Sequence, residues 1–241
     1  MSSQTLNGFI LHRRPYRETS VILDIFSLEW GKFSAVGKGV RGSKSDKKSL
    51  LQPFQALLLH VSGKHELKNL QQVEALSPSI NLVGNGLFSA MYINELLNRL
   101  LANEMPHPLL FALYQQVLDG LAQNQPLEPL LRQFELSLLA DLGYGIDFCH
   151  DGHSGEALQA DTHYCYVAEL GWIRQSGLVS RFAFTGEVLL QIDQLQWTPA
   201  SLQCAKYISR LALAPLLGDK PLKSRELFQR NWSTHDASTL E

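Results

Sequence analysis

Short segments of alternating apolar and polar residues follow one another along the first 76 residues. In the clearest of them, Val21, Leu23 and Ile25 alternate with the residues between them. This period of two is typical of a strand with one buried face. Similar segments, rich in β-branched and aromatic residues, predict five strands in all, at residues 6–12, 20–28, 32–37, 52–61 and 67–76.

Turn-forming residues separate these predicted strands. The breaks are Arg13-Arg14-Pro15, Trp30-Gly31, a basic stretch at residues 38–48, and Ser62-Gly63-Lys64. Five short strands within about seventy residues indicate a small closed barrel. The five-stranded oligonucleotide-binding (OB) fold is the commonest candidate, and an SH3-like barrel is the alternative.

From Pro78 onward, the apolar residues recur at helical spacing. Three such runs span 93–101, 109–121 and 130–139, and prolines precede the second and third, as suits a first helical turn. Thr185 and Thr198 are expected to cap two further helices. Residues 146–184 are polar and predict a loop with a hairpin at 164–167 and 171–173. The chain is therefore predicted to be an α+β multidomain protein. It has an OB-fold domain at 1–78 and an all-α helical domain at 79–241 that includes a loop or hairpin insertion at about 146–184.

Charge is distributed unevenly along the chain. Residues 1–77 carry 11 Lys and Arg against 6 Asp and Glu, whereas residues 78–170 carry 2 against 11. The near-neutral total of −2 therefore conceals a basic N-terminal part and an acidic middle. Charge at this level indicates partners rather than fold, and a basic barrel is suited to binding a polyanion.

The basic residues predict a nucleic-acid-binding surface. Five cations lie in the stretch 38–48, and further cations flank Tyr16, whose ring could stack on a base. A second cluster lies at 220–225. A solvated loop and a solvated helix are the alternatives for the two clusters. The predicted DNA-binding residues are Arg14, Arg17, Lys38, Arg41, Lys44, Lys47, Lys48, Lys220, Lys223 and Arg225.

Catalytic and metal-binding motifs are weak. Cys149, His153, His163 and Cys165 are of the types that bind zinc, but their spacing matches no common zinc module. We therefore predict no metal, no cofactor and no catalytic residue. Three cysteines, a polar N-terminus and the lack of a long apolar run predict a cytoplasmic protein that does not bind membranes.

Arg132 stands out as one of two cations in the acidic middle of the chain. It could form an ordinary ion pair with Glu128 or Glu135. Alternatively, a single Arg at the edge of an apolar groove could bind a carboxylate or an acidic peptide.

Several motifs, taken in order, resemble the RecO family of bacterial recombination mediators. They include Leu11–Ser20, Val36–Arg41 and Leu51-Gln-Pro-Phe54, followed by Tyr92–Leu97, Arg132–Leu136, Leu142-Gly-Tyr-Gly145 and residues 220–228. Each motif alone is weak, but the ordered set covers nearly the whole chain. Many members of this family carry a four-cysteine zinc module after the Leu-Gly-Tyr motif. Here Gly152 replaces the partner of Cys149, which implies a degenerate, metal-free, zinc-finger-like loop region.

The resemblance implies a mediator that binds single- and double-stranded DNA, anneals complementary strands and helps load RecA onto DNA coated with single-stranded-DNA-binding protein (SSB). It would act with RecR, and in some members with RecF, at the nucleoid. The acidic, Phe-terminated tail of SSB would bind at Arg132 and Leu136, with Leu113 as a wall residue. Two alternatives from other classes remain open. They are a scaffold that binds only proteins and a metal-assisted nuclease that uses the Cys and His residues of the loop.

Overall fold

The computed structural model describes residues 3–41, 47–177 and 180–227. Its contacts group the chain into two compact units. The first consists of Met1–Leu127 together with Asp219–Glu241, and the second of Glu128–Gly218. No helix among the described residues has the length and apolar character needed to cross a bilayer.

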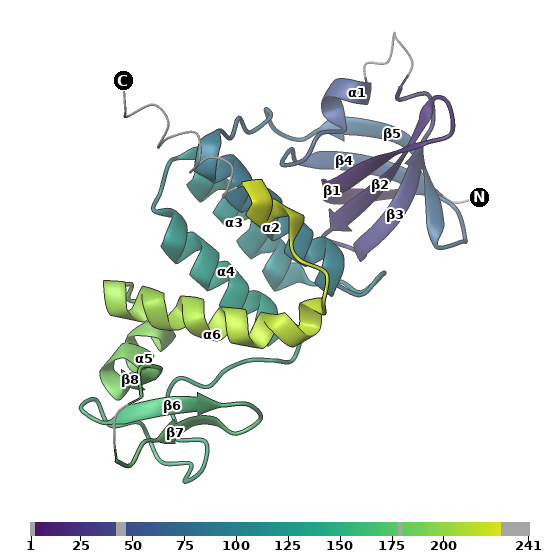
Figure 1. Ribbon diagram of the computed structural model, residues 1–241. Coiled ribbons are helices and arrows are strands. Elements are labelled where there is room, and N and C mark those ends of the chain that lie inside the picture. Colours follow the sequence, from purple (N-terminus) through teal and green to yellow (C-terminus); the bar gives the residue numbers. More distant parts are fainter. Residues whose placement is uncertain (1–2, 42–46, 178–179, 228–241) are drawn as a thin grey trace, which may run out of the picture. The chain divides into compact units, whose positions relative to one another are not determined.

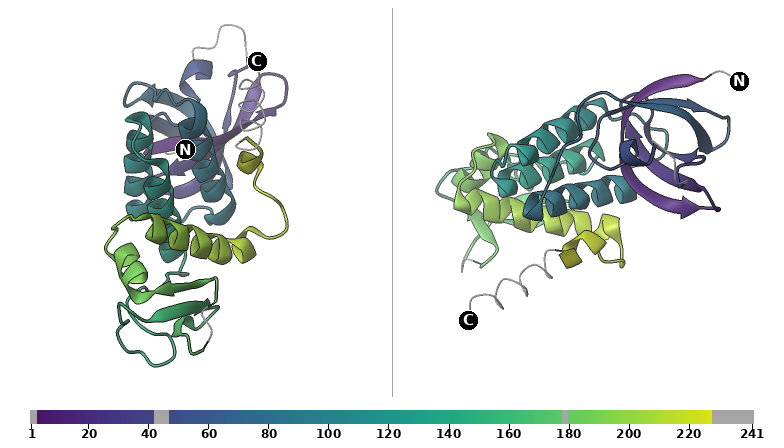
Figure 2. Two further views of the ribbon diagram at one scale, coloured as in Figure 1. Left: turned by 60° about the vertical axis from the view of Figure 1, so that its left-hand side comes forward. Right: turned by 90° about the horizontal axis from the view of Figure 1, so that it is seen from above.

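A closed barrel of five strands opens the first unit (Figure 1). The strands, in the order β1-β2-β3-β5-β4, pair antiparallel except for the parallel pair β3 and β5. Their curvature around the barrel is visible from above in Figure 2. This barrel confirms the predicted OB-like fold. The strands are β1 (Gln4–Tyr16), β2 (Ser20–Ser27), β3 (Gly31–Gly37), β4 (Leu57–Ser62) and β5 (Leu67–Ala75), and the short helix α1 (Lys47–Leu50) lies between β3 and β4.

Two predicted boundaries of the barrel are wrong. Arg13-Arg14-Pro15 does not break the first strand, because β1 continues to Tyr16 and pairs with β2 up to Ser20. Pro15 is tolerated because, among the described strands, this half of β1 pairs with β2 alone, as at a sheet edge. The fourth strand begins at Leu57 rather than at residue 52, since Pro53 and Phe54 lie in the approach to it.

Helices α2 (Gly84–Leu100) and α3 (Pro108–Ala122) belong to the same unit as the barrel. Aromatic rings join them to it, with Phe9 and Phe26 of the barrel lying 5.6 and 5.3 Å from Phe111, measured between ring centroids. This packing explains why the first unit extends past the barrel to Leu127.

The second unit combines helices with a small sheet. The hairpin predicted from sequence is present as β6 (His163–Val167) and β7 (Gly171–Arg174), and the three-residue strand β8 (Ala183–Thr185) adds to the other edge of β6. Strand β8 was not predicted, because it is too short to show an alternating pattern. Thr198 caps the last helix through a capping box with Ser201. The helices are α4 (Leu127–Asp141), α5 (Gly186–Asp193) and α6 (Pro199–Leu217), and their shared core is built around Trp172.

Candidate nucleic-acid interface

A basic hollow lies on the barrel, where the end of β1 meets the β3–α1 connection. It has a volume of about 400 Å³ and contains four cationic side chains, while Pro15, Val21 and Val40 supply its apolar lining. We call it the cationic hollow, and its cations are Arg13, Arg14, Arg41 and Lys48. Three of the predicted DNA-binding residues, from two separate segments of the sequence, therefore line one cavity.

Backbone hydrogen bonds fix the shape of this hollow. The amide of Arg41 donates to the carbonyl of Thr19 at 2.9 Å, and its guanidinium donates to the carbonyl of Arg17 at 3.1 Å. Arg17 itself has the left-handed φ of 51° that the β1–β2 turn requires, and its guanidinium lies 5.1 Å from the centre of the Tyr16 ring. Both turns at this end of the barrel are thereby tied together, which brings cations from different segments of the chain close to one another.

The other predicted cations of the barrel have different positions. Arg17 and Lys38 are exposed but do not line the hollow, and Lys47 is half-buried, with its ammonium donating to the Gln71 carbonyl at 3.0 Å. Lys44 lies outside the described residues. The apolar residues Val21 and Val40 were not singled out from the sequence, because buried valines in a barrel carry no signal of a binding site.

The C-terminal cations Lys220, Lys223 and Arg225 are exposed on a segment that α2 holds in place. Arg99 donates to the carbonyl of Lys220 at 2.8 Å. Glu95 accepts hydrogen bonds from the amides of Lys223 and Ser224 and from the Ser224 hydroxyl at 2.7 Å. Partial burial opposes the charge on Glu95, but the hydrogen bonds from Ser224 and Lys223, with Arg99 nearby, hold its pKa below the usual value. The carboxylate therefore stays charged and keeps the segment attached at neutral pH.

Arg132 lies in the second unit and is buried, with only 7% of its surface exposed. Its guanidinium pairs with Glu135 at 3.0 Å, whereas Glu128 pairs with Lys206 of α6 at 3.3 Å. The Nε of Arg132 is buried and has no hydrogen-bond partner among the described residues. The guanidinium thus keeps one donor unused.

The two leucines proposed for the same groove lie in different units. Leu136 is half-buried on α4 and packs against the core of the second unit. Leu113 is half-buried on α3 in the first unit.

A carboxylate, Asp151, organises the loop for which a degenerate zinc module was predicted. It accepts hydrogen bonds from the amides of His153 and Ser154 and, across the loop, from that of Arg174, all at 2.8–2.9 Å. The bond from Ser154, against the opposing effect of burial, holds the pKa of Asp151 below its usual value. Asp151 thus links the loop to β7 through hydrogen bonds.

The cysteine and histidine side chains of this loop form no metal-binding cluster. No three His, Cys, Asp or Glu side chains among the described residues converge as metal ligands would. Burial and the neighbouring Asp193 carboxylate raise the pKa of the Cys149 thiol, so it stays protonated at neutral pH. The Sγ of Cys165 instead donates to the side-chain oxygen of Gln175 at 3.2 Å.

The chain is similar to known proteins over its whole length. Residues 1–79 match the family model described as "Recombination protein O N terminal", and residues 84–226 match "Recombination protein O C terminal". A DNA repair protein RecO of Pseudoalteromonas atlantica is 54% identical over 230 residues, which cover 95% of this chain and 96% of that protein. DNA repair protein RecO of Vibrio cholerae is 46% identical over 242 residues, covering all of both chains.

Proposed function

Because the chain belongs to the RecO family of DNA repair proteins, we propose that it is a recombination mediator that anneals complementary strands and helps load RecA onto SSB-coated single-stranded DNA. The main support for this proposal is the cationic hollow, which brings four cations together in one cavity of the barrel. Neutralising phosphates on two strands lowers their mutual repulsion, so annealing requires no bond chemistry. The proposed partners are single- and double-stranded DNA, the SSB tail, RecR and RecF, in the cytoplasm at the nucleoid.

Replacement of the cations that line the hollow should weaken DNA binding and reduce the dependence of that binding on salt. We expect the variant Arg14→Ala/Arg41→Ala/Lys48→Ala to bind a labelled single-stranded oligonucleotide about 100-fold more weakly at low salt. Three lost phosphate contacts should also reduce the slope of log K against log salt by about 2. Fluorescence anisotropy across a salt series measures both quantities.

A matched control separates this site from overall charge. Lys64, Arg181 and Arg210 are exposed cations outside the hollow, and replacing all three with Ala removes the same charge. This control should retain most of the affinity and the wild-type slope. Equal losses in the two triple variants would show that net charge, rather than the hollow, binds DNA.

The SSB tail is proposed to bind at α4, with Arg132 as the residue that recognises a carboxylate. Support comes from the guanidinium itself, because its buried Nε has no partner among the described residues while another of its nitrogens holds Glu135. A planar guanidinium can serve two carboxylates through different donors. Because this Nε is buried, neighbouring side chains would have to move before the tail could contribute a second carboxylate there.

Replacement of the whole ion pair should weaken tail binding without unfolding the protein. Removing both charges, as in Arg132→Met/Glu135→Met, avoids leaving one charge buried alone, and such apolar replacements are often tolerated. We expect this variant to bind a labelled acidic peptide that ends in Phe at least about tenfold more weakly, because hydrogen bonds to charged groups are lost. The control Glu128→Met/Lys206→Met removes the exposed pair that also involves α4 and should bind normally. Unchanged peptide affinity in the Arg132 variant would place the tail elsewhere.

A further inference from the structure

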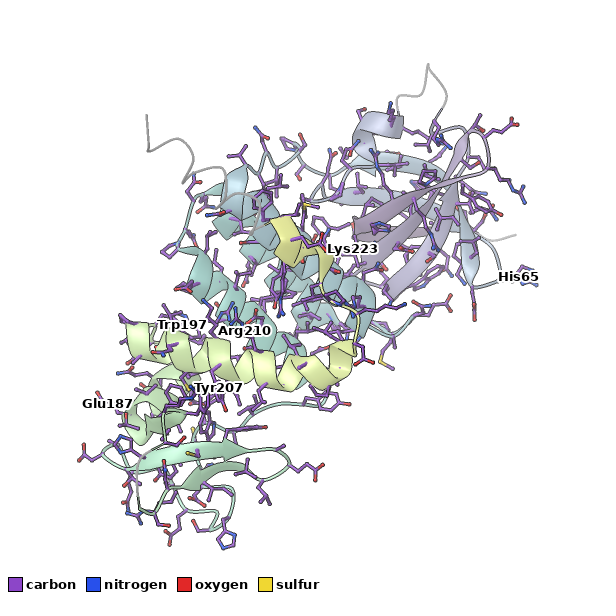
Figure 3. All side chains as sticks on the ribbon, in the orientation of Figure 1. His65, Glu187, Trp197, Tyr207, Arg210 and Lys223 are labelled. Carbon is purple, nitrogen blue, oxygen red and sulfur yellow. The ribbon has the colours of Figure 1, made fainter. Side chains whose placement is uncertain are left out.

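A second cavity in the first unit lies next to the cationic hollow. Its volume is about 610 Å³, within the range of small-molecule sites. Residues of β1, the approach to β4, α2 and the segment 223–227 line it, and all of them belong to one compact unit. Figure 3 labels Lys223, which belongs to the last of these segments. We call this cavity the apolar pocket.

The walls of the apolar pocket suit a flat, uncharged group. Leu11, Pro53, Phe54, Met91 and Leu227 supply apolar surface. Met91 projects from α2 with 41% of its surface exposed, although Met is usually buried. Aromatic rings and thioethers are favourable neighbours for a planar π system.

Phe54 occupies an unusual backbone conformation beside this pocket. Its φ is +68°, a left-handed value that is rare and strained for a bulky residue. Such conformations tend to occur at functional sites. The preceding residue, Pro53, bridges to Ile10 of β1, which fixes this turn against the barrel. The Leu51-Gln-Pro-Phe54 motif, which DNA binding at the hollow leaves unexplained, thus shapes the wall of the pocket.

Positive and negative side chains around the apolar pocket largely offset one another. Arg99 and Lys223 line it together with Glu95 and Glu226. Glu95 lies 3.9 Å from Arg99 and accepts hydrogen bonds from the amides of Lys223 and Ser224. Arg13 lines both the apolar pocket and the cationic hollow. A strand whose phosphates lie in the hollow would therefore place a neighbouring base against the apolar walls of the pocket.

We propose that the apolar pocket accepts an unpaired nucleobase of single-stranded DNA bound at the cationic hollow. This inference rests on the proposed DNA binding and adds to it a preference for single strands. Bases in a duplex are stacked and paired, and extracting one breaks both interactions. A bare single strand has no pairing to break, so it can place a base in the pocket more easily.

The experiment compares an oligothymidylate with an oligonucleotide of equal length in which every base is replaced by an abasic spacer. The phosphates are the same in both, so any difference in affinity reports contacts to bases. We expect wild-type protein to bind the abasic strand about tenfold more weakly, as for the loss of one stacked base. The variant Met91→Ala should bind oligothymidylate about fivefold more weakly than wild type does. Its affinity for the abasic strand should be only about twofold lower than its affinity for oligothymidylate.

Met105→Ala is the matched control, because Met105 is also an exposed methionine of the first unit but does not line the pocket. This variant should bind the abasic strand about tenfold more weakly than oligothymidylate, as wild type does. The inference would be overturned, with DNA binding left intact, if wild-type protein bound the two strands equally. It would also be overturned if Met91→Ala lost as much affinity on the abasic strand as wild type does. Failure of both strands to bind at low salt would overturn the inference together with the proposed function.

Discussion

Replacement of Gly31 with alanine is expected to lower the free energy of unfolding by about 4 kcal/mol. Gly31 has a φ of +68°, and a Cβ at this position would lie only 1.7 Å from the carbonyl oxygen of Met105. A left-handed alanine costs about 1–2 kcal/mol, and overpacking against backbone adds typically about 1–3 kcal/mol. The backbone at Met105 cannot rotate away as a side chain could, so the connection between α2 and α3 would have to move.

The contacts around Gly31 explain why this movement would be costly. The amide of Glu104 donates to the carbonyl of Lys32 at 2.7 Å, and the Lys32 ammonium donates to the carbonyl of Asn98 at 2.8 Å. Lys68 of β5 pairs with Glu104 at 2.6 Å. Displacement of the connection would therefore break several links between the barrel and the helices at once.

Gly39→Ala is the control for this prediction. Gly39 also has a left-handed φ, of +71°, but no described residue lies within 4 Å of the position that a Cβ would take there. It should lose only about 1–2 kcal/mol, the cost of the conformation alone. Urea denaturation of both variants measures the difference, and equal losses would show that the collision with Met105 has no cost.

Replacement of Asn94 with leucine is the second change with a large expected effect. Asn94 is buried on α2, accepts a hydrogen bond from the Tyr114 hydroxyl at 2.6 Å and donates to the Leu11 carbonyl of β1 at 3.1 Å. The change would leave a buried hydroxyl and a buried carbonyl without this partner, at about 1–3 kcal/mol each. We therefore expect a loss of about 3–4 kcal/mol in the free energy of unfolding.

A double-mutant cycle tests whether the loss comes from the hydrogen bond. Tyr114→Phe alone should cost about 1–2 kcal/mol, and the double variant Asn94→Leu/Tyr114→Phe should be more stable than the sum of the single losses predicts, because no hydroxyl is then left unpaired. Strict additivity would contradict this account.

Burial raises the pKa of Tyr114, although the hydrogen bond to Asn94 opposes the shift. The hydroxyl therefore stays protonated, and the coupling should not change between about pH 6 and pH 9.

Part of the candidate site could be predicted from the sequence. The basic stretch at 38–48 and the arginines near Tyr16 were both predicted, because clustered charge is visible along a chain. That Arg14 and Arg41 line the same hollow could not be predicted, because it depends on pairing between β1, β2 and β3. The apolar pocket was also missed, since its walls come from four separate segments.

Local pattern by itself determined most elements of this protein. Alternation in the strands, helical spacing after Pro78 and the cap at Thr198 depend only on neighbouring residues, and they predicted the barrel strands and helices α2 to α6. Thr185 precedes α5 but makes no side-chain capping hydrogen bond, and the short elements α1 and β8 show no pattern of their own. Only the tertiary structure decided where β1 ends. The strand continues past Pro15 because its residues up to Tyr16 pair with β2. It also decided that Arg132 is buried and pairs with Glu135 rather than with Glu128. Burial and strand pairing depend on residues far apart in the chain, and a local pattern does not contain that information.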